Sequence, residues 1–129
     1  LAHEEITRLA VAVEDVDFDR LRFRLETVLD PHPYITKSLP HLCEILHPGA
    51  GKHKALSWLQ RHLGIPACHT VAFGNGREDV QMLNEAGLGV TVEGGEQAAL
   101  AIADVVAAPL EDDGPARVME ELLNQGAIG

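Results

Sequence analysis

The residues best suited to chemistry lie in the run HTVAFGNGREDVQMLNEAG, which spans positions 69–87. An apolar run at 70–73 predicts a strand, and a turn of small and polar residues follows it: Gly74, Asn75, Gly76, Glu78 and Asp79. Two glycines at the carboxyl end of a strand let the backbone turn sharply and come close to a ligand. Open α/β sheets bind ligands beyond these strand ends, and an oxygen-rich cluster there suits Mg²⁺ and a phosphate.

A purely structural interpretation of the same turn also stands. Asn and Gly favour turns, and acidic residues in a first helical turn interact well with the helix dipole. Taken alone, the turn is compatible with both interpretations.

Lys52 is the second candidate for chemistry. It follows two glycines in the run HPGAGKHKAL and directly precedes a predicted helix. A lysine at a glycine-rich helix start can bind phosphate together with free backbone N–H groups. The alternative is an ordinary solvated lysine.

An acidic stretch nearer the N-terminus offers a third, weaker candidate. The strand predicted at 6–13 runs toward Asp15, Asp17 and Asp19, and an Asp-x-Asp pair there could supply a phosphoryl-accepting nucleophile beside a general acid. The same residues also suit a strand-to-helix turn, with Asp17 as the N-cap of the next helix.

The second half of the chain alternates between helices and strands, an order typical of a parallel sheet with helices on both faces. We expect helices at 53–63, 77–86, 96–102 and 115–124, and strands at 69–73, 88–92 and 104–107. The first half has α+β character. There we expect a strand at 6–13, a helix at 17–29 with a stripe from Phe18 to Val28, and strands at 34–36 and 42–46.

The composition limits the classes of partner that the protein can bind. The net charge of −10 argues against nucleic acid and anionic membranes, which both attract basic surfaces. No run approaches the roughly 18 apolar residues of a membrane helix. Cys43 and Cys68 lack metal-binding spacing, and we expect both to be buried thiols in a cytoplasmic protein.

The motifs together resemble the haloacid dehalogenase superfamily, and within it the Cof-type phosphatases with an inserted α/β cap. The resemblance covers residues from about 42 to 123. The matching runs are GAGKHKAL at 49–56, LGI at 63–65, AFGNGREDVQML at 72–83, AG at 86–87, AD at 103–104 and DDG at 112–114.

This resemblance implies a role for each candidate residue. Lys52 is the catalytic lysine that holds the phosphate, with Gly74 and Gly76 beside it. Asn75, Glu78 and Asp79 form the Mg²⁺ site, and Asp79 supports either the metal or the lysine. The implied substrate is a small phosphorylated metabolite such as a sugar phosphate. The implied organisation is a partial cap at 1–48 and the C-terminal half of the core at 49–129.

The sequence departs from the family pattern in three places. The family's nucleophile motif, Asp-x-Asp-Gly-Thr, is absent from these residues, so we expect the chain to be part of a longer protein and to be inactive alone. Asn75 stands where the family has a metal-binding Asp, and Glu78 where it has an Asn. An amide oxygen can bind Mg²⁺, but it carries no charge and binds more weakly.

Two further expectations follow from these departures. An incomplete core leaves apolar surface uncovered, so we expect self-association or pairing with the missing half. The functional alternative is a non-catalytic domain of the same fold that binds a ligand or a protein. A response-regulator-like or Rossmann-like domain is disfavoured, since no GxGxxG run opens a βαβ unit.

Overall fold

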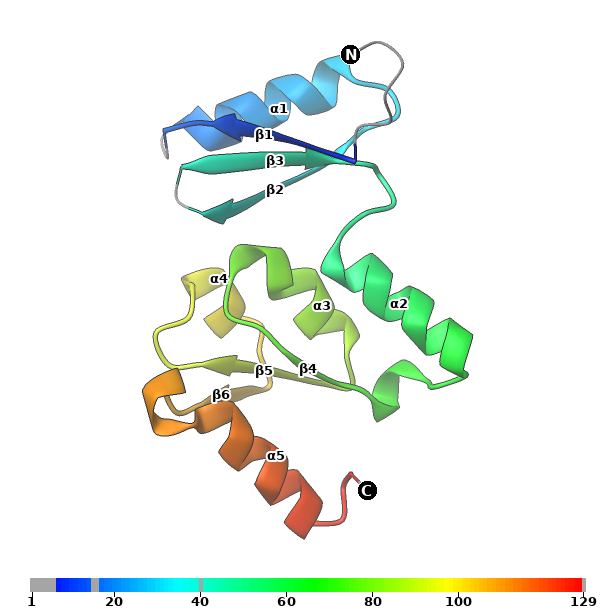
Figure 1. Ribbon diagram of the computed structural model, residues 1–129, viewed down its shortest axis with the longest axis vertical. Helices are drawn as coiled ribbons and strands as arrows, with labels where there is room; N and C mark the ends of the chain where they lie inside the picture. The colour runs from blue at the N-terminus through cyan, green and yellow to red at the C-terminus, as the bar shows by residue number, and fades with distance from the viewer. Residues whose placement is uncertain (1–6, 15–16, 40, 129) are drawn as a thin grey trace.

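Two small sheets follow one another along the chain, as the computed structural model shows (Figure 1). The structure describes residues 7–14, 17–39 and 41–128. We call β1, α1, β2 and β3 the N-terminal unit, and the elements from α2 onward the C-terminal unit. In the described part of the chain, no helix is both long and apolar enough to cross a membrane.

The N-terminal unit is an antiparallel sheet with the strand order β1-β3-β2 and one covering helix. Its elements are β1 (Arg8–Ala12), α1 (Phe18–Val28), β2 (Tyr34–Leu39) and β3 (Leu42–Leu46). This arrangement confirms the predicted α+β character. The helix lies on the face of the sheet away from the C-terminal unit (Figure 1).

Strand alternation decides which side chains of the N-terminal unit meet that helix. Ile35 and Cys43 are buried with Phe18 in one cluster. The residues one position along each strand point to the other face, toward the C-terminal unit. At the far end of α1, Val28 is 73% exposed, so the expected apolar stripe does not extend that far. Asp17 occupies the N-cap position, but its side chain makes no capping hydrogen bond.

The C-terminal unit is a parallel sheet with the strand order β4-β5-β6. Its strands are β4 (Val71–Phe73), β5 (Leu88–Val92) and β6 (Val105–Ala107). The alternating order of helices and strands therefore predicted the fold class correctly.

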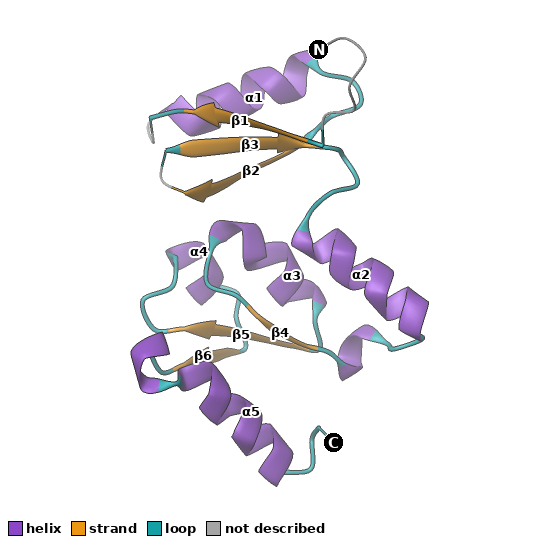
Figure 2. Cartoon of the chain, viewed as in Figure 1, coloured by secondary structure: helices purple, strands orange, loops and turns teal. Residues whose placement is uncertain are grey.

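Helices cover both faces of this parallel sheet (Figure 2). α3 (Val80–Glu85) and α4 (Gln97–Leu100) pack on one face, and α5 (Gly114–Asn124) packs on the other. α2 (Lys52–Leu63) packs mainly against α3. The core beneath α3 and α4 consists of Ala72, Leu83 and Ala99.

Several sequence-based expectations about local structure were wrong. Residues 69 and 70 do not join the strand, because a 3₁₀ turn at Ala67–His69 precedes it and the Thr70 hydroxyl donates to the Ala67 carbonyl at 2.6 Å. Cys68 in this turn is exposed, so only Cys43 is a buried thiol.

The position after α3 is occupied by Gly87, where the chain has no room for a side chain. A Cβ added to Gly87 would lie 2.6 Å from the Cys68 carbonyl.

The large apolar side chains of α2 are mostly uncovered. Leu59 and Leu63 are exposed, and the buried side chain of this helix is His53. Other large apolar side chains are also exposed in the C-terminal unit: Trp58, Val106, Leu110, Met119 and Leu123. In the described residues, β4 pairs on one side only, so its other edge is open.

We predict that the isolated chain self-associates, since exposed apolar helix faces and an open strand edge both favour association. Sedimentation velocity over a range of protein concentrations measures this directly, and dimers or larger species are expected to increase with concentration. A monomer at every concentration, unaffected by salt, would contradict the prediction.

Candidate functional site

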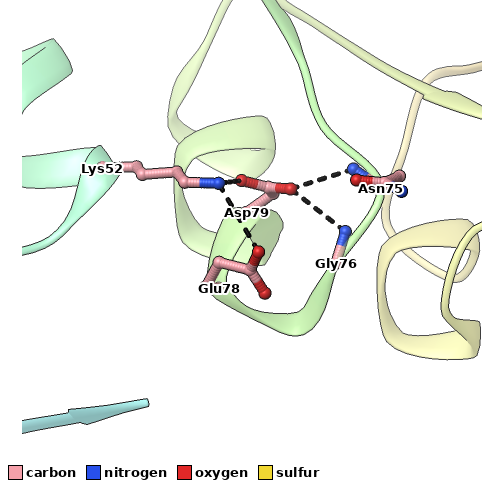
Figure 3. A network of polar contacts seen from close by, with 5 residues as sticks. All are labelled: Lys52, Asn75, Gly76, Glu78 and Asp79. Carbon is pink, nitrogen blue, oxygen red and sulfur yellow. Dashed lines mark hydrogen bonds and ion pairs between the residues drawn. The ribbon is translucent and has the colours of Figure 1, made fainter. Parts of the chain in front are cut away.

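Lys52 and the 74–79 turn meet at the carboxyl end of β4 (Figure 3). Lys52 is the first residue of α2, and Asp79 ends a 3₁₀ turn at Arg77–Asp79. The Lys52 Nζ lies 2.5 Å from Asp79 Oδ1 and 3.5 Å from Glu78 Oε1. The structure therefore brings together the two candidate motifs, which lie 27 residues apart in the sequence.

Asp79 holds the turn as well as the lysine. Its side chain is almost fully buried, and Oδ2 accepts hydrogen bonds from the backbone N–H groups of Asn75 at 2.9 Å and Gly76 at 3.0 Å. One carboxylate thus has both oxygens engaged within the protein. Charge-assisted bonds of this kind are the stronger class of protein hydrogen bond.

The two glycines of the turn are required by close packing. A Cβ on Gly74 would lie 2.4 Å from the Asp79 Cβ, and one on Gly76 would lie 2.5 Å from Glu78 Oε2. Neither glycine has a positive φ. The two glycines therefore let the backbone come close to the side chains of Asp79 and Glu78.

A segment that the sequence reasoning missed also positions the turn. The backbone N–H of Glu96 donates to the Asn75 carbonyl at 2.8 Å, and the Gly74 N–H donates to Val90 on β5 at 3.0 Å. A Cβ on Gly95 would lie 3.3 Å from the Asn75 carbonyl oxygen. The available signal was the Gly94-Gly95 pair, which follows the neighbouring parallel strand and so falls at the same end of the sheet.

The structure describes two of the three aspartates in the acidic stretch near α1, namely Asp17 and Asp19. Asp17 lies at the start of α1, and the exposed Asp19 carboxylate is 4.0 Å from Arg77 Nη1. Asp15 lies outside the described residues.

The opposite charges of Lys52 and Asp79 stabilise each other. Burial opposes ionisation of Asp79, but the hydrogen bonds from Lys52, Gly76 and Asn75 and the lysine charge outweigh it, so its pKa lies below the usual value. For Lys52, burial also opposes the charge, but Asp79 and then Glu78 raise the pKa of the ammonium. Both groups are therefore charged at neutral pH.

The residues of this chain fit part of a magnesium site. Mg²⁺ takes six oxygen ligands, and both Asp79 oxygens are already engaged. The remaining side-chain oxygens of the turn belong to Asn75 and Glu78. No group of three or more His, Cys, Asp or Glu side chains in the described residues could hold a metal ion. Any further ligands must come from water, from a phosphate or from another segment.

A cleft of about 420 Å³ adjoins Lys52 and separates the two units. Lys52 and Glu78 lie on its C-terminal side, and Tyr34, Thr36 and Glu44 line it from β2 and β3. Sequence reasoning did not single out these last three residues. The signal was a polar residue at alternate strand positions, which places Thr36 and Glu44 on the sheet face opposite Ile35 and Cys43.

Comparison with known proteins assigns the chain to a family. The family described as haloacid dehalogenase-like hydrolase matches residues 1–119. The chain belongs to this haloacid dehalogenase-like family. The resemblance predicted from the motifs is thereby confirmed.

Individual relatives agree with the assignment. The haloacid dehalogenase-like chain is 30% identical over 122 residues to the 5-amino-6-(5-phospho-D-ribitylamino)uracil phosphatase of Bacillus subtilis strain 168, covering 92% of this chain and 44% of that protein. A sugar phosphatase of subclass IIB in the superfamily has a solved structure with a TM-score of 0.81 and 25% identity, covering 94% of this chain and 45% of that one. A haloacid dehalogenase-like hydrolase from B. subtilis gives a TM-score of 0.80 and 28% identity, covering 93% and 42%.

The haloacid dehalogenase-like chain spans less than half the length of each of these relatives. Their names and structures therefore describe proteins of which this chain matches only a part.

We predict that Asp79→Asn lowers the free energy of unfolding by about 1–3 kcal/mol near neutral pH, because it removes charge-assisted hydrogen bonds to Lys52 and the turn. Since the folded-state pKa of Asp79 is lowered, its stabilisation is present above the unfolded pKa of about 3.9 and is lost as the pH falls through the folded value. The raised pKa of Lys52 acts at the other end of the range. Its contribution is present below about pH 10.4 and is lost as the pH rises through the folded value.

Urea unfolding of the haloacid dehalogenase-like chain and its Asp79→Asn variant measures this difference from about pH 7 down to about pH 3. The gap between the two proteins is expected to narrow toward acid. Asp112→Asn, at an exposed position, is the matched control and should stay within about 0.5 kcal/mol of the natural chain. An equal gap at every pH would show that the Asp79 charge contributes nothing.

Proposed function

We propose that this chain is the C-terminal part of a phosphatase that hydrolyses phosphate monoesters of small metabolites, with Mg²⁺ as its cofactor. The observation that carries the proposal is the Lys52 ammonium, which Asp79 holds 2.5 Å away at the carboxyl end of a parallel strand. The phosphatase named among its relatives and the family of hydrolases support the same activity.

The chemistry assigned to this chain is electrostatic. A phosphate monoester is dianionic, and negative charge shifts among its oxygens as the bond to the alcohol breaks. A fixed ammonium next to these oxygens stabilises that charge without reorganisation at the moment of reaction. Asp79 acts as a positioning residue, because it contacts the lysine and the turn through both of its oxygens.

The charge balance of the site supports a need for a metal ion. Lys52 contributes one positive charge, whereas Asp79 and Glu78 together contribute two negative charges within 3.5 Å of its ammonium. A dianionic ester approaching this cluster meets net repulsion. We propose that Glu78 and Asn75 help to hold Mg²⁺, which would neutralise this charge and polarise a phosphoryl oxygen.

The remaining parts of the enzyme are proposed to lie outside this chain. The nucleophile would be an aspartate on a strand that pairs with the open edge of β4, supplied by a preceding segment of the same protein. That segment would also cover the exposed apolar face of α2. The proposed location is cytoplasmic, where the two free thiols would stay reduced.

We predict that the complete protein hydrolyses phosphate monoesters and that Lys52→Ala lowers kcat/KM by about 100- to 1000-fold, the usual effect of losing a preorganised charge-stabilising group. Steady-state phosphate release with a panel of small phosphate esters, with and without EDTA, measures the activity and its metal requirement. Lys54→Ala is the matched control, because Lys54 is exposed on the same helix and should leave kcat/KM unchanged.

A second experiment separates this activity from the alternative of a non-catalytic binding domain. The double change Asn75→Asp with Glu78→Asn moves the carboxylate of the turn from position 78 to position 75, and it should change the Mg²⁺ concentration for half-maximal activity. A complete protein that hydrolyses no ester, with or without this change, would remove the basis of the enzymatic proposal and favour the binding domain.

A further inference from the structure

His53 is a buried residue that the proposed chemistry does not use. Only 5% of its surface is exposed, although the large apolar side chains of α2 are mostly exposed. Among the described residues, its Nδ1 has no hydrogen-bond partner. An unpaired ring nitrogen is costly to bury, so hydrogen bonding at Nδ1 does not account for this position. The groups that pack around the imidazole ring must account for it instead.

The ring of His53 packs against a residue of the N-terminal unit. Tyr34 is the first residue of β2, and its ring centroid lies 5.7 Å from that of His53, with the two planes tilted by 57°. Aromatic rings at this separation attract each other in addition to burying apolar surface. Tyr34 is also the register partner of Leu46, the last residue of β3. The contact therefore lies where the chain leaves the N-terminal sheet.

Gly51 leaves the space in which the two rings meet. An added Cβ would lie 2.8 Å from His53 Cε1 and 3.3 Å from Tyr34 Cζ. The φ of Gly51 is +120°, which a residue with a side chain rarely adopts. Gly51 ends the linker at 47–51, which connects β3 to α2 and so joins the two units (Figure 1). We call Tyr34, Gly51 and His53 the inter-unit joint.

The inter-unit joint flanks the lysine of the site. Lys52 lies between Gly51 and His53 in the chain and is the first residue of α2. Tyr34, Gly51 and Lys52 also line the same cleft of about 420 Å³. A rotation of the N-terminal unit about the linker would therefore move the Tyr34 side of the cleft relative to Lys52. The ammonium itself would stay in place, because Asp79 holds it from within the C-terminal unit.

An ion pair between the two units is a weak restraint on such a rotation. The Asp19 carboxylate lies 4.0 Å from Arg77 Nη1, and the two side chains are 85% and 54% exposed. Exposed pairs of this kind contribute little, and salt screens them. Ring packing is not screened by salt. β2 also contacts the 3₁₀ turn at Arg77–Asp79, so the inter-unit joint fixes the angle of a sheet that already lies close to the site.

We infer that His53 is a positioning residue, which holds the N-terminal unit at a fixed angle beside Lys52 through the ring of Tyr34. His53 itself does not line the cleft, so it acts on substrate binding rather than on the chemical step. Because the ring makes the contact and Nδ1 has no partner among the described residues, phenylalanine should replace histidine here. The kinetic consequence rests on the proposed phosphatase activity, whereas the ring contact does not.

NMR of this chain tests the ring contact without reference to activity. Tyr34 is the single tyrosine of the sequence, so its ring signals can be assigned without ambiguity. A nuclear Overhauser effect between the ring protons of Tyr34 and those of His53 is expected in the natural chain. Its absence would show that the two rings do not meet and would overturn the inference.

Steady-state kinetics of the complete protein tests the consequence. His53→Ala is expected to raise KM by about 2- to 10-fold, the range for the loss of an aromatic pair, and to change kcat by less than about twofold. His53→Phe should keep both values. His41→Ala is the control, because His41 is exposed at the turn between β2 and β3 and should change neither value.

A double-mutant cycle separates the inter-unit joint from a direct contact of Tyr34 with the substrate. His53→Ala and Tyr34→Ala should each raise KM, and together they should raise it by less than the product of their separate effects, because both remove the same contact. If His53→Ala does not fold, His53→Leu takes its place in the cycle and must show the same rise in KM.

Three kinetic results would overturn the inference: an unchanged KM in the variant without the ring, a His53→Phe variant as impaired as His53→Ala, or effects of the two positions that simply multiply. The second of these would mean that the nitrogen, and not the ring, does the work. A complete natural protein without activity toward any ester would refute the phosphatase proposal and the kinetic part of the inference with it. That result is distinguishable from a missing contact between the rings of Tyr34 and His53.

Discussion

The Asp79 carboxylate joins segments that are far apart in the sequence. One oxygen accepts from Lys52 at the start of α2, and the other accepts from the backbone of Asn75 and Gly76 after β4. An unpaired buried carboxylate is costly, so each of these donors stabilises the ionised form that the others need. Asp79 thus links the start of α2 to the turn after β4, and the hydrogen bonds from Glu96 to Asn75 and from Gly74 to Val90 hold the same turn from the other side.

The same arrangement places more negative than positive charge around the Lys52 ammonium. Asp79 fixes Lys52 but also offsets its charge, and Glu78 lies 3.5 Å from the same ammonium. Glu78 replaces the asparagine expected from the family resemblance, and Asn75 replaces the aspartate, so the turn keeps the same number of carboxylates and changes their position. A metal ion bound at this turn would therefore find its carboxylate ligand at Glu78, on the 3₁₀ turn, and an uncharged amide at Asn75, near the end of the strand.

The sequence predicted the parallel sheet and its covering helices, because these depend on local patterns and on the order of the elements. That Lys52 and the 74–79 turn belong to one site was implied only by the family resemblance. It could not show that both Asp79 oxygens are engaged, since that depends on the distance between α2 and β4. Which side chains of α2 are buried could not be predicted for a related reason. The helical period identifies an apolar face, but Leu59 and Leu63 are buried only if some other segment packs against them. Thr36 and Glu44 were missed because they line a cleft with Lys52 only once the two units come together, which no local pattern predicts.

The account depends most on the claim that the Asp79 carboxylate fixes the turn, and backbone amide hydrogen exchange at Asn75 and Gly76 tests it most directly. NMR should find both amides protected in the natural chain, with exchange faster by about tenfold or more in Asp79→Asn, since each N–H loses a charged acceptor. Lys52→Met should produce a smaller increase, because it removes the partner of the other oxygen only. Exchange at the rate of an open loop in the natural chain, or equal protection in all three proteins, would contradict the claim.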